Sequence, residues 1–370
     1  MTYSIHWPHH IQFGTQSLEQ LPQFLETLPK PIVAVVDNGV RSFVEPFLKV
    51  RGKSCLLITN TTINPSWDAV SDLRHRIAGI RPKTIIGVGG GSTLDVVKAV
   101  SHVPPELNWT DIRGVNRIPE WPERMTSVLI PTTAGTGSEI SPSIVLADPE
   151  LNKAAATSPN LVADVAWIDP LMILTAPLNV TRDSGIDALT HSIEAYLALG
   201  HNPLTDAIAL KGIELIVGFL PRLVSGDRNE AVAEAVSQGS LLGGFAFSVA
   251  GLGAIHGLSY TLSHRYGLSH GRSNALLLGP VLSFNQSAAP NRVSTILAQF
   301  PEGATTVSRI REWLHTLGVP PTLHNYGGSI TDCDSLSDEG FRTGQRLFGN
   351  NVRPITPQDV QNIMEGLFET

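Results

Sequence analysis

The stretch Thr84-Ile-Ile-Gly-Val88-Gly89-Gly90-Gly91-Ser92-Thr93-Leu94-Asp95 decides the fold that we expect. It begins as an apolar run, typical of a strand buried on both faces, and passes through three glycines into a helical pattern. Glycines let the backbone approach an anion, and the following helix N-terminus offers free N–H groups. The stretch therefore predicts a phosphate or pyrophosphate site. A plain turn with a capping box, Ser92-x-x-Asp95, is the alternative.

Similar apolar runs before and after this stretch predict further buried strands, at residues 31–36, 54–59 and 127–131. Helical patterns at 17–28, 44–50 and 67–78 alternate with them, and such alternation predicts a parallel α/β sheet. The first residues, 4–14, alternate loosely and predict an edge hairpin.

A second loop, Pro131-Thr132-Thr133-Ala-Gly135-Thr136-Gly137-Ser138-Glu139, follows the last of these strands. Its hydroxyls and free backbone can hold ribose or phosphate oxygens, although a polar turn is the alternative. Ligands of open α/β sheets bind at the carboxyl ends of the strands, so both loops are expected to line one crevice.

Two further residues are candidate cofactor contacts. Asp37 ends the first buried strand, where a carboxylate binds ribose hydroxyls and repels a 2′-phosphate. It therefore favours NAD over NADP, although a turn-forming Asp-Asn-Gly is the other interpretation. Lys153 is either a cationic contact to the cofactor or a solvated surface lysine.

The second half of the chain changes character. Residues 148–177, with Asp148-Pro149, Asp169-Pro170 and Ala176-Pro177, are expected to connect two domains. We therefore expect a Rossmann-like dinucleotide-binding α/β domain over residues 1–178 and an all-helical domain over residues 179–370. Helical patterns cover 184–199, 202–219, 229–247, 253–266, 275–285, 293–298, 305–317, 337–348 and 357–368.

One helix of the second half carries a possible metal site. Asp187 and His191 are four residues apart, so their side chains lie one turn apart on one face. With His256 and His270 they form a plausible ligand set for Fe²⁺ or Zn²⁺, which accept mixed nitrogen and oxygen ligands. A surface Asp–His hydrogen bond and structural histidines are the alternatives.

Composition excludes several classes of protein. The 370 residues are 42% hydrophobic and 16% charged, with a net charge of −7 and no basic run, so nucleic acid is not an expected partner. Only Cys55 and Cys333 occur, which suits a reducing cytoplasm. We expect a cytoplasmic protein, because neither a signal pattern nor a long apolar run is visible.

Several of these stretches together resemble the iron-containing (group III) alcohol dehydrogenases. They are Gly89-Gly-Gly-Ser-Thr-Leu-Asp95, Pro131-Thr-Thr-Ala-Gly-Thr-Gly-Ser-Glu139, Gly185-Ile-Asp-Ala-Leu-Thr-His191-Ser-Ile-Glu194-Ala-Tyr and Gly244-Phe-Ala-Phe-Ser248…His256. A weaker echo is Asn351-Val-Arg-Pro-Ile-Thr. The resemblance runs in order from about Asn64-Pro65 to His270-Gly271.

The resemblance implies a dehydroquinate-synthase-like fold, a site in the cleft between the domains, and a homodimer or larger assembly. It also implies roles for residues at matching positions. The metal ligands would be Asp187, His191, His256 and His270. The cofactor contacts would be Asp37, Asn64, Gly90, Gly91, Ser92, Asp95, Thr132, Thr133, Thr136 and Lys153, with Ser141 and Val145 as weaker matches.

One position departs from the pattern. Many members carry a second histidine four residues after the third metal ligand, where this chain has Tyr260. Relatives that act on phosphonate-bearing or other acidic aldehydes resemble it there. A neutral phenol donates one hydrogen bond, so Tyr260 is a candidate proton relay or substrate contact, with a packing role as the alternative. His264, one turn further, is a second candidate.

The expected activity is therefore that of a metal-dependent, NAD(P)-linked dehydrogenase or reductase of a small alcohol or aldehyde, acidic substrates such as phosphonate-bearing aldehydes included. A glycerol-dehydrogenase-like polyol enzyme shares the fold and would differ in metal content and polyol turnover. A dehydroquinate-synthase-type lyase would need more basic residues for a phosphorylated substrate. A nucleotide-binding protein without catalysis would show no hydride transfer with added metal.

Overall fold

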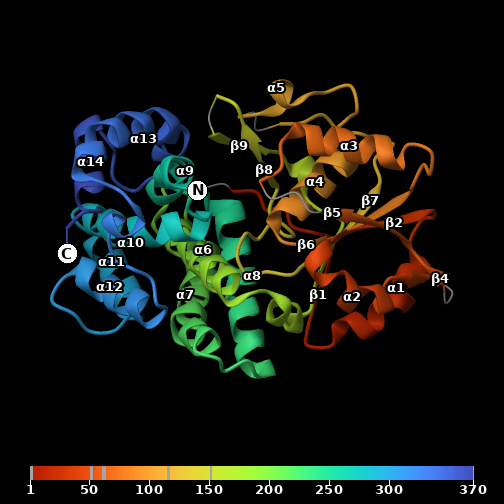
Figure 1. Ribbon diagram of the computed structural model, residues 1–370, viewed down its shortest axis with the longest axis horizontal. Helices are drawn as coiled ribbons and strands as arrows, with labels where there is room; N and C mark the ends of the chain where they lie inside the picture. The colour runs from red at the N-terminus through yellow and green to blue at the C-terminus, as the bar shows by residue number, and fades with distance from the viewer. Residues whose placement is uncertain (1–2, 51–52, 61–63, 115–116, 151, 370) are drawn as a thin grey trace. The chain divides into compact units, whose positions relative to one another are not determined.

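The computed structural model describes residues 3–50, 53–60, 64–114, 117–150 and 152–369 (Figure 1). The chain divides into two compact units, Thr2–Pro177 and Leu178–Thr370. The first unit is built on a parallel sheet and the second is built of helices.

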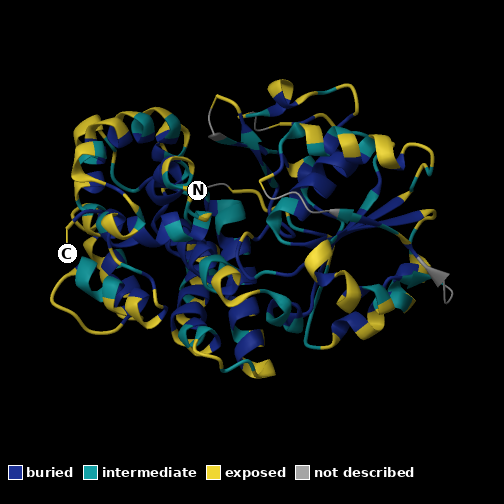
Figure 2. Cartoon of the chain, in the orientation of Figure 1, coloured by how far each residue is buried: buried dark blue, intermediate teal, exposed yellow. Residues whose placement is uncertain are grey.

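The first unit is organised on a six-stranded parallel sheet. Its spatial order is β1 (His10–Phe13), β10 (Val165–Ile168), β7 (Thr126–Pro131), β6 (Thr84–Gly89), β2 (Ile32–Asp37) and β5 (Leu56–Asn60). The three central strands β7, β6 and β2 are nearly continuous runs of buried residues, as expected for a sheet covered on both faces (Figure 2). The predicted parallel α/β fold is confirmed.

Side chains of successive strand residues enter two different cores. Val33 and Val35 of β2 join one cluster, with α3 (Trp67–Ile77) and α4 (Gly91–His102). Ala34 and Val36 join the other, with α1 (Leu21–Thr27) and α2 (Arg41–Val44). This alternation follows from the two-residue repeat of a strand. The sheet is therefore the middle layer of three.

The expectation of an N-terminal hairpin is wrong. β1 pairs in parallel with β10, from His10 opposite Val165 to Phe13 opposite Ile168. The loose alternation at the start of the chain was therefore typical of a sheet edge, but its partner strand lies more than 150 residues away in the sequence.

The expectation of a connecting segment over residues 148–177 is also wrong. This segment holds β10 and the second strand of the antiparallel hairpin β8 (Ser143–Asp148) and β9 (Asn152–Thr157). Its proline-containing pairs had suggested loops. Asp169 instead caps the 3₁₀ helix Pro170–Thr175 by accepting the N–H of Leu171 at 3.0 Å, and it also accepts the N–H of Leu18 at 3.1 Å.

The second unit is helical throughout its described residues, as predicted, and each predicted helical segment overlaps one helix. These helices are α6 (Leu178–Leu197), α7 (Pro203–Val224), α8 (Glu230–Ala250), α9 (Ala254–Tyr266), α10 (His270–Gln286), α11 (Pro290–Leu297), α12 (Thr306–Thr316), α13 (Cys333–Phe348) and α14 (Pro357–Glu365). The remaining short elements of the first unit are α5 (Trp109–Ile112), β3 (Lys49–Val50) and β4 (Lys53–Ser54).

Small residues let the long helices of this unit approach closely. A Cβ built on Gly185 of α6 would lie 2.5 Å from Leu220 of α7, and one on Gly243 of α8 would lie 2.9 Å from the carbonyl oxygen of Ala188. Such close packing fixes the rotation of α6 about its axis, and therefore the direction of its polar face.

Among the described residues, no single helix has both the length and the apolarity needed to cross a membrane. The bent pair Glu230–Ala250 and Ala254–Tyr266, broken at 110°, passes that test by length and composition alone.

His102, at the end of α4, makes the first unit sensitive to acid. Its Nδ1 lies 2.9 Å from the carbonyl oxygen of Asn160 and its Nε2 lies 2.8 Å from Ser127 Oγ, so a neutral ring donates to the first and accepts from the second. Burial, with a smaller contribution from nearby Arg124, lowers the pKa of His102 to about 4. Between pH 6.5 and pH 4, His102 is therefore protonated in the unfolded chain but not in the folded chain, so stability falls as the pH falls through this range.

We predict that His102→Gln, which does not titrate, flattens the acid dependence of stability. Between pH 7 and pH 5 the wild type loses about 2 kcal/mol through this residue, which the variant does not lose. Urea denaturation at both pH values measures the difference. Equal losses in wild type and variant would show that His102 is not the responsible group.

Candidate metal centre and cofactor loops

The two loops rich in glycine and threonine lie against each other at the carboxyl ends of β6 and β7. A Cβ built on Gly91, the first residue of α4, would lie 2.7 Å from Thr136 Cγ2, and one on Gly90 would lie 3.6 Å from Thr133 Oγ1. The N–H of Thr132 donates to the carbonyl of Gly89 at 3.0 Å. The first turn of α4 therefore begins beside the threonines, as an anion site would require.

The alternative of a capping box at Ser92 is wrong. α4 starts two residues earlier than a Ser92 cap would require, with Gly90 as its N-cap, so Ser92 already lies in the first turn. The carboxylate of Asp95 accepts from Ser138 Oγ at 2.5 Å and from the N–H of Val145 at 2.9 Å. It ties the threonine loop and β8 to α4.

Lys98 also connects α4 to the threonine loop and β8, and the sequence analysis did not predict this role. Its ammonium group is fully buried and donates to the carbonyls of Ser138 at 2.8 Å, Ser141 at 3.2 Å and Ser143. It also lies 3.7 Å from Asp95 Oδ1. The available signal was a lysine three residues after Asp95 in an otherwise apolar helix. Among the candidate cofactor residues, Asp95, Ser141 and Val145 therefore contribute bonds within the protein.

The other candidate cofactor residues occupy three positions of this unit. Asp37, at the end of β2, accepts the N–H of Gly39 at 2.8 Å, so its turn-forming role is observed. A Cβ on Gly89 would lie 3.2 Å from Asp37 Cβ, which places this carboxylate beside the glycine loop. Asn64 is exposed with a φ of 51°, and Lys153 is half-buried on β9 opposite Ala147.

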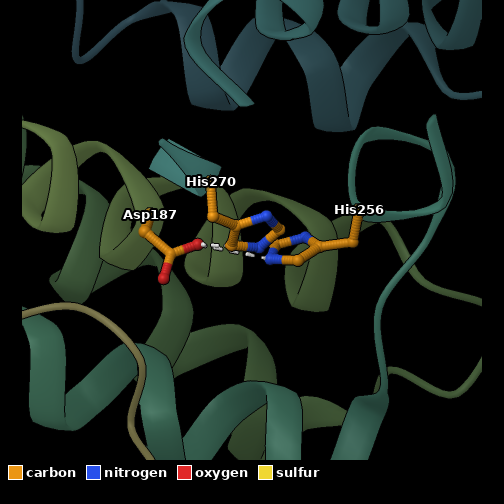
Figure 3. Close-up of side chains that lie close together, drawn as sticks. All are labelled: Asp187, His256 and His270. Atoms are coloured by element: carbon orange, nitrogen blue, oxygen red, sulfur yellow. Dashed lines mark ion pairs between the residues drawn. The ribbon is translucent and has the colours of Figure 1, made fainter. Parts of the chain in front are cut away.

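The second unit brings the candidate metal ligands together from three helices. Asp187 and His191 lie on α6, His256 in the first turn of α9, and His270 begins α10. The Nε2 atoms of His256 and His270 are each 3.5 Å from Asp187 Oδ1, and that of His191 is 3.9 Å away. Figure 3 shows the first two imidazoles directed at the Asp187 carboxylate. The ligand atoms of Asp187, His256 and His270 all lie within 4.8 Å of one another, close enough to hold one metal ion.

His191 lies directly beside these three residues. Its ring stacks on that of His256, with centroids 4.7 Å apart, and on that of Phe247 at 4.3 Å. Phe247 therefore forms an apolar wall next to the cluster.

The hydrogen bonds of His256 test whether this cluster fits a metal. Its Nδ1 lies 2.6 Å from Glu194 Oε2, so the ring donates there and Nε2 is the nitrogen left to face the cluster. In the described part of the chain, the buried Nε2 has no hydrogen-bond partner. A buried ring nitrogen beside a carboxylate and two further imidazoles, with no hydrogen bond to lose when a cation displaces its proton, fits a divalent cation such as Fe²⁺ or Zn²⁺.

The electrostatics of the cluster agree with this interpretation. Burial by itself lowers the pKa of His256, but Glu194 and Asp187 outweigh it and raise that pKa to about 9. Burial by itself raises the pKa of Asp187, but His191 and His270 hold it well below its usual range. The centre of the site therefore favours positive charge, which a divalent cation would supply.

Two neighbours of the ligands escaped the sequence analysis as functional residues. Glu194 was quoted only within its motif, and its partner His256 is 62 residues away. Asn274 Nδ2 donates to Asp187 Oδ1 at 2.8 Å. Its only signal was its place one turn after His270 on a helix whose first residue is a ligand.

The two candidate catalytic residues occupy different surroundings. Tyr260 stacks on His270 with ring centroids 5.3 Å apart, so its ring contacts a candidate ligand. The side chain of His264 is 56% exposed, and its Nδ1 lies 3.4 Å from Glu339 Oε1 on α13.

Gly271 fixes the position of His270, which precedes it. A Cβ built there would lie 1.7 Å from the carbonyl oxygen of Asp183, a backbone atom that cannot yield as a side chain can. We predict that Gly271→Ala costs about 1–3 kcal/mol of stability and weakens Zn²⁺ binding, because the start of α10 must move away from α6. Chelator competition and urea denaturation measure the two effects.

Gly218→Ala is the matched control. This exposed helical glycine has open space around its Cβ position, so alanine should stabilise α7 by up to about 1 kcal/mol and leave Zn²⁺ affinity unchanged. Unaltered Zn²⁺ affinity in the Gly271 variant would contradict the proposed constraint on His270.

Comparison with known proteins identifies the family. Residues 8–170 match the model of iron-containing alcohol dehydrogenase, and residues 181–368 match that of the C-terminal part of the Fe-containing alcohol dehydrogenase family. The chain is 31% identical to long-chain-alcohol dehydrogenase 1 of Geobacillus thermodenitrificans (strain NG80-2), over 97% of this chain and 94% of that protein. It is 29% identical to NADPH-dependent butanol dehydrogenase of Clostridium saccharobutylicum (98% and 97%). With sulfoacetaldehyde reductase of Bilophila wadsworthia (strain 3_1_6) it shares 28% identity (90% and 88%).

Solved structures agree with these relatives. A crystal structure of 1,3-propanediol oxidoreductase superposes with a TM-score of 0.90 at 27% identity and covers 100% of both chains. The sheet-based first unit and the helical second unit are thus shared along the full length. The chain belongs to the iron-containing alcohol dehydrogenase family, and it is an oxidoreductase that acts on CH–OH groups.

Proposed function

We propose that this protein is a metal-dependent, NAD(P)-linked dehydrogenase that interconverts a small alcohol and its aldehyde. The observation that carries the proposal is the convergence of Asp187, His256 and His270, with the unpartnered Nε2 of His256 at its centre. We assign the metal to these three residues and His191, with Fe²⁺ or Zn²⁺ as the ion.

The side chains of the protein have three tasks in this reaction: they hold the metal ion, orient the substrate and supply a proton. A bound Fe²⁺ or Zn²⁺ supplies Lewis acidity, which polarises a carbonyl oxygen and lowers the pKa of an alcohol. To hold the ion, each imidazole would present a nitrogen whose proton has left. Tyr260, one turn after His256 and stacked on His270, offers a phenol that can orient the substrate oxygen or pass a proton to it.

The loops of the first unit are proposed to bind the cofactor. The first turn of α4, beside Thr133 and Thr136, offers N–H groups and hydroxyls to a pyrophosphate. The carboxylate of Asp37 beside the glycine loop favours ribose hydroxyls over a 2′-phosphate, and therefore NAD over NADP. Because one relative is NADPH-dependent, activity should be assayed with NADPH as well as with NADH.

The substrate class is proposed from the relatives together with Tyr260. The relatives' names cover long-chain alcohols, butanol and sulfoacetaldehyde, an anionic aldehyde. We propose a small aldehyde, neutral or acidic, and regard a polyol as the competing substrate of a glycerol-dehydrogenase-like enzyme.

We predict that metal-stripped protein regains aldehyde reduction when Fe²⁺ or Zn²⁺ is added, and that Asp187→Asn does not. Removing a ligand should cost more than about 100-fold in activity, because even partners of ligands are worth about 10–100-fold. The assay follows NADH or NADPH oxidation with butanal, lactaldehyde, sulfoacetaldehyde and glycerol-derived aldehydes.

Asp206→Asn is the matched control. Asp206 also pairs with a histidine, His201 at 3.2 Å, but on α7 and with Arg292 as a second partner, so the variant should retain wild-type turnover. If no aldehyde were reduced with either nucleotide after reconstitution, the proposal would be replaced by nucleotide binding without catalysis.

We predict that Tyr260→Phe lowers kcat on the order of 100-fold and changes KM little, because the phenol acts during proton transfer. Steady-state kinetics separate the two constants. Tyr266→Phe on the same helix is the control: its hydroxyl donates to Asp332 at 2.9 Å, so its loss should cost about 1 kcal/mol of stability and leave kcat unchanged. Wild-type kcat in the Tyr260 variant would leave that residue a packing role only.

A further inference from the structure

Glu194 is a buried carboxylate that the proposed ligand set does not include. It lies seven residues after Asp187 and three after His191, so α6 presents all three side chains on one face. Its side chain is 5% exposed. A carboxylate is buried at this level only when partners satisfy both its oxygens.

Both oxygens are satisfied from the first turn of α9. Glu194 Oε1 accepts the N–H of Ile255 at 2.5 Å, and Oε2 accepts from His256 Nδ1 at 2.6 Å. One carboxylate from α6 therefore holds the backbone of α9 and the ring of its candidate ligand at the same time.

The start of α9 is shaped for this contact. Its N-cap is Gly253, which has no side chain to cap the helix, so the oxygens of other segments approach instead. A Cβ on Gly253 would lie 3.3 Å from Glu194 Oε1 and 3.1 Å from Asn351 Oδ1. Asn351 Oδ1 lies 3.4 Å from the N–H of Ala254, and its amide pairs with Asn285. The echo Asn351-Val-Arg-Pro-Ile-Thr thus has a structural role here.

We propose that Glu194 is the positioning residue of the metal site and sets its affinity through His256. By accepting from Nδ1 it fixes the tautomer in which Nε2 carries the lone pair, and by capping α9 it fixes the direction of that lone pair. The inference rests on the proposed metal site. Carboxylates that accept from the second nitrogen of a ligating histidine commonly tune metal affinity in this way.

Glu194→Gln separates this role from a purely structural one. Glutamine has the same length, and its oxygen can still accept the N–H of Ile255, which is always a donor. Its NH₂ group then meets His256 Nδ1, which must accept, so the ring proton moves to Nε2. Helix capping survives while the tautomer reverses.

The experiment measures Zn²⁺ affinity of the metal-stripped full chain by competition with a chromophoric chelator at pH 7.5. Glu194→Gln should bind Zn²⁺ about 10–100-fold more weakly than the wild type. Glu194→Asp, which keeps the charge and both acceptors, should retain more affinity than the glutamine variant. Asp binding no better than Gln would overturn the proposal, and this comparison requires only that both chains remain folded by circular dichroism.

Glu339→Gln is the matched control. Glu339 also faces a histidine of α9, His264 at 3.4 Å, and it lies 3.0 Å from Arg265 on the same helix. If Glu194 acts through His256 and not merely as a negative charge beside α9, removing the charge of Glu339 should change Zn²⁺ affinity by less than about twofold.

His256→Ala tests the route of the effect. In that background Glu194→Gln should cost no further affinity, because the ring through which it acts is gone. An undiminished loss would overturn action through His256 while leaving the metal site standing. If the wild type bound no Zn²⁺, the proposed metal site itself would be overturned. If Glu194→Gln bound Zn²⁺ as tightly as the wild type, only the role of Glu194 would be overturned. Should Glu194→Gln fail to fold, Glu194→Asp tests the same route through its shorter reach: it should bind Zn²⁺ more weakly than the wild type, and an equal loss in the His256→Ala background would overturn action through His256.

Discussion

The interaction on which this protein depends is the meeting of three imidazole Nε2 atoms at one carboxylate oxygen, Asp187 Oδ1. The groups are nearly all buried, and a buried acceptor without a partner is costly. Nothing in the local sequence of one helix stabilises such a cluster. Without a metal, a proton on His256 stabilises the cluster, and the proposed cation would take the place of that proton.

The helical unit is built to tolerate this cost. Glycines at Gly185, Gly243 and Gly271 remove the side chains that would hold α6 away from α7, α8 and the start of α10. From outside the cluster, Asn274 donates one hydrogen bond to Asp187 and Glu194 accepts one from His256. Close packing and directed hydrogen bonds thus convert three flexible side chains into a preorganised site.

Local patterns were enough to predict four of the six strands of the sheet, the helical unit and the candidate ligands. The glycine turn at Gly89–Gly91 and the one-turn spacing of Asp187 and His191 are short-range features that a single stretch of sequence displays. Contacts between distant residues were not predictable in the same way. β10 was hidden because Asp169-Pro170 looks like a loop until its carboxylate is seen to cap a turn, and the roles of Lys98 and Glu194 exist only once loops and helices have met.

The most direct test of the central claim is the X-ray absorption spectrum of the purified protein loaded with one equivalent of Zn²⁺. The account predicts scattering from three imidazoles and one carboxylate oxygen, at about 2.0–2.2 Å from the ion. It also predicts loss of one imidazole contribution in His256→Ala. A spectrum of a fully hydrated ion, or one without imidazole scattering, would contradict the account.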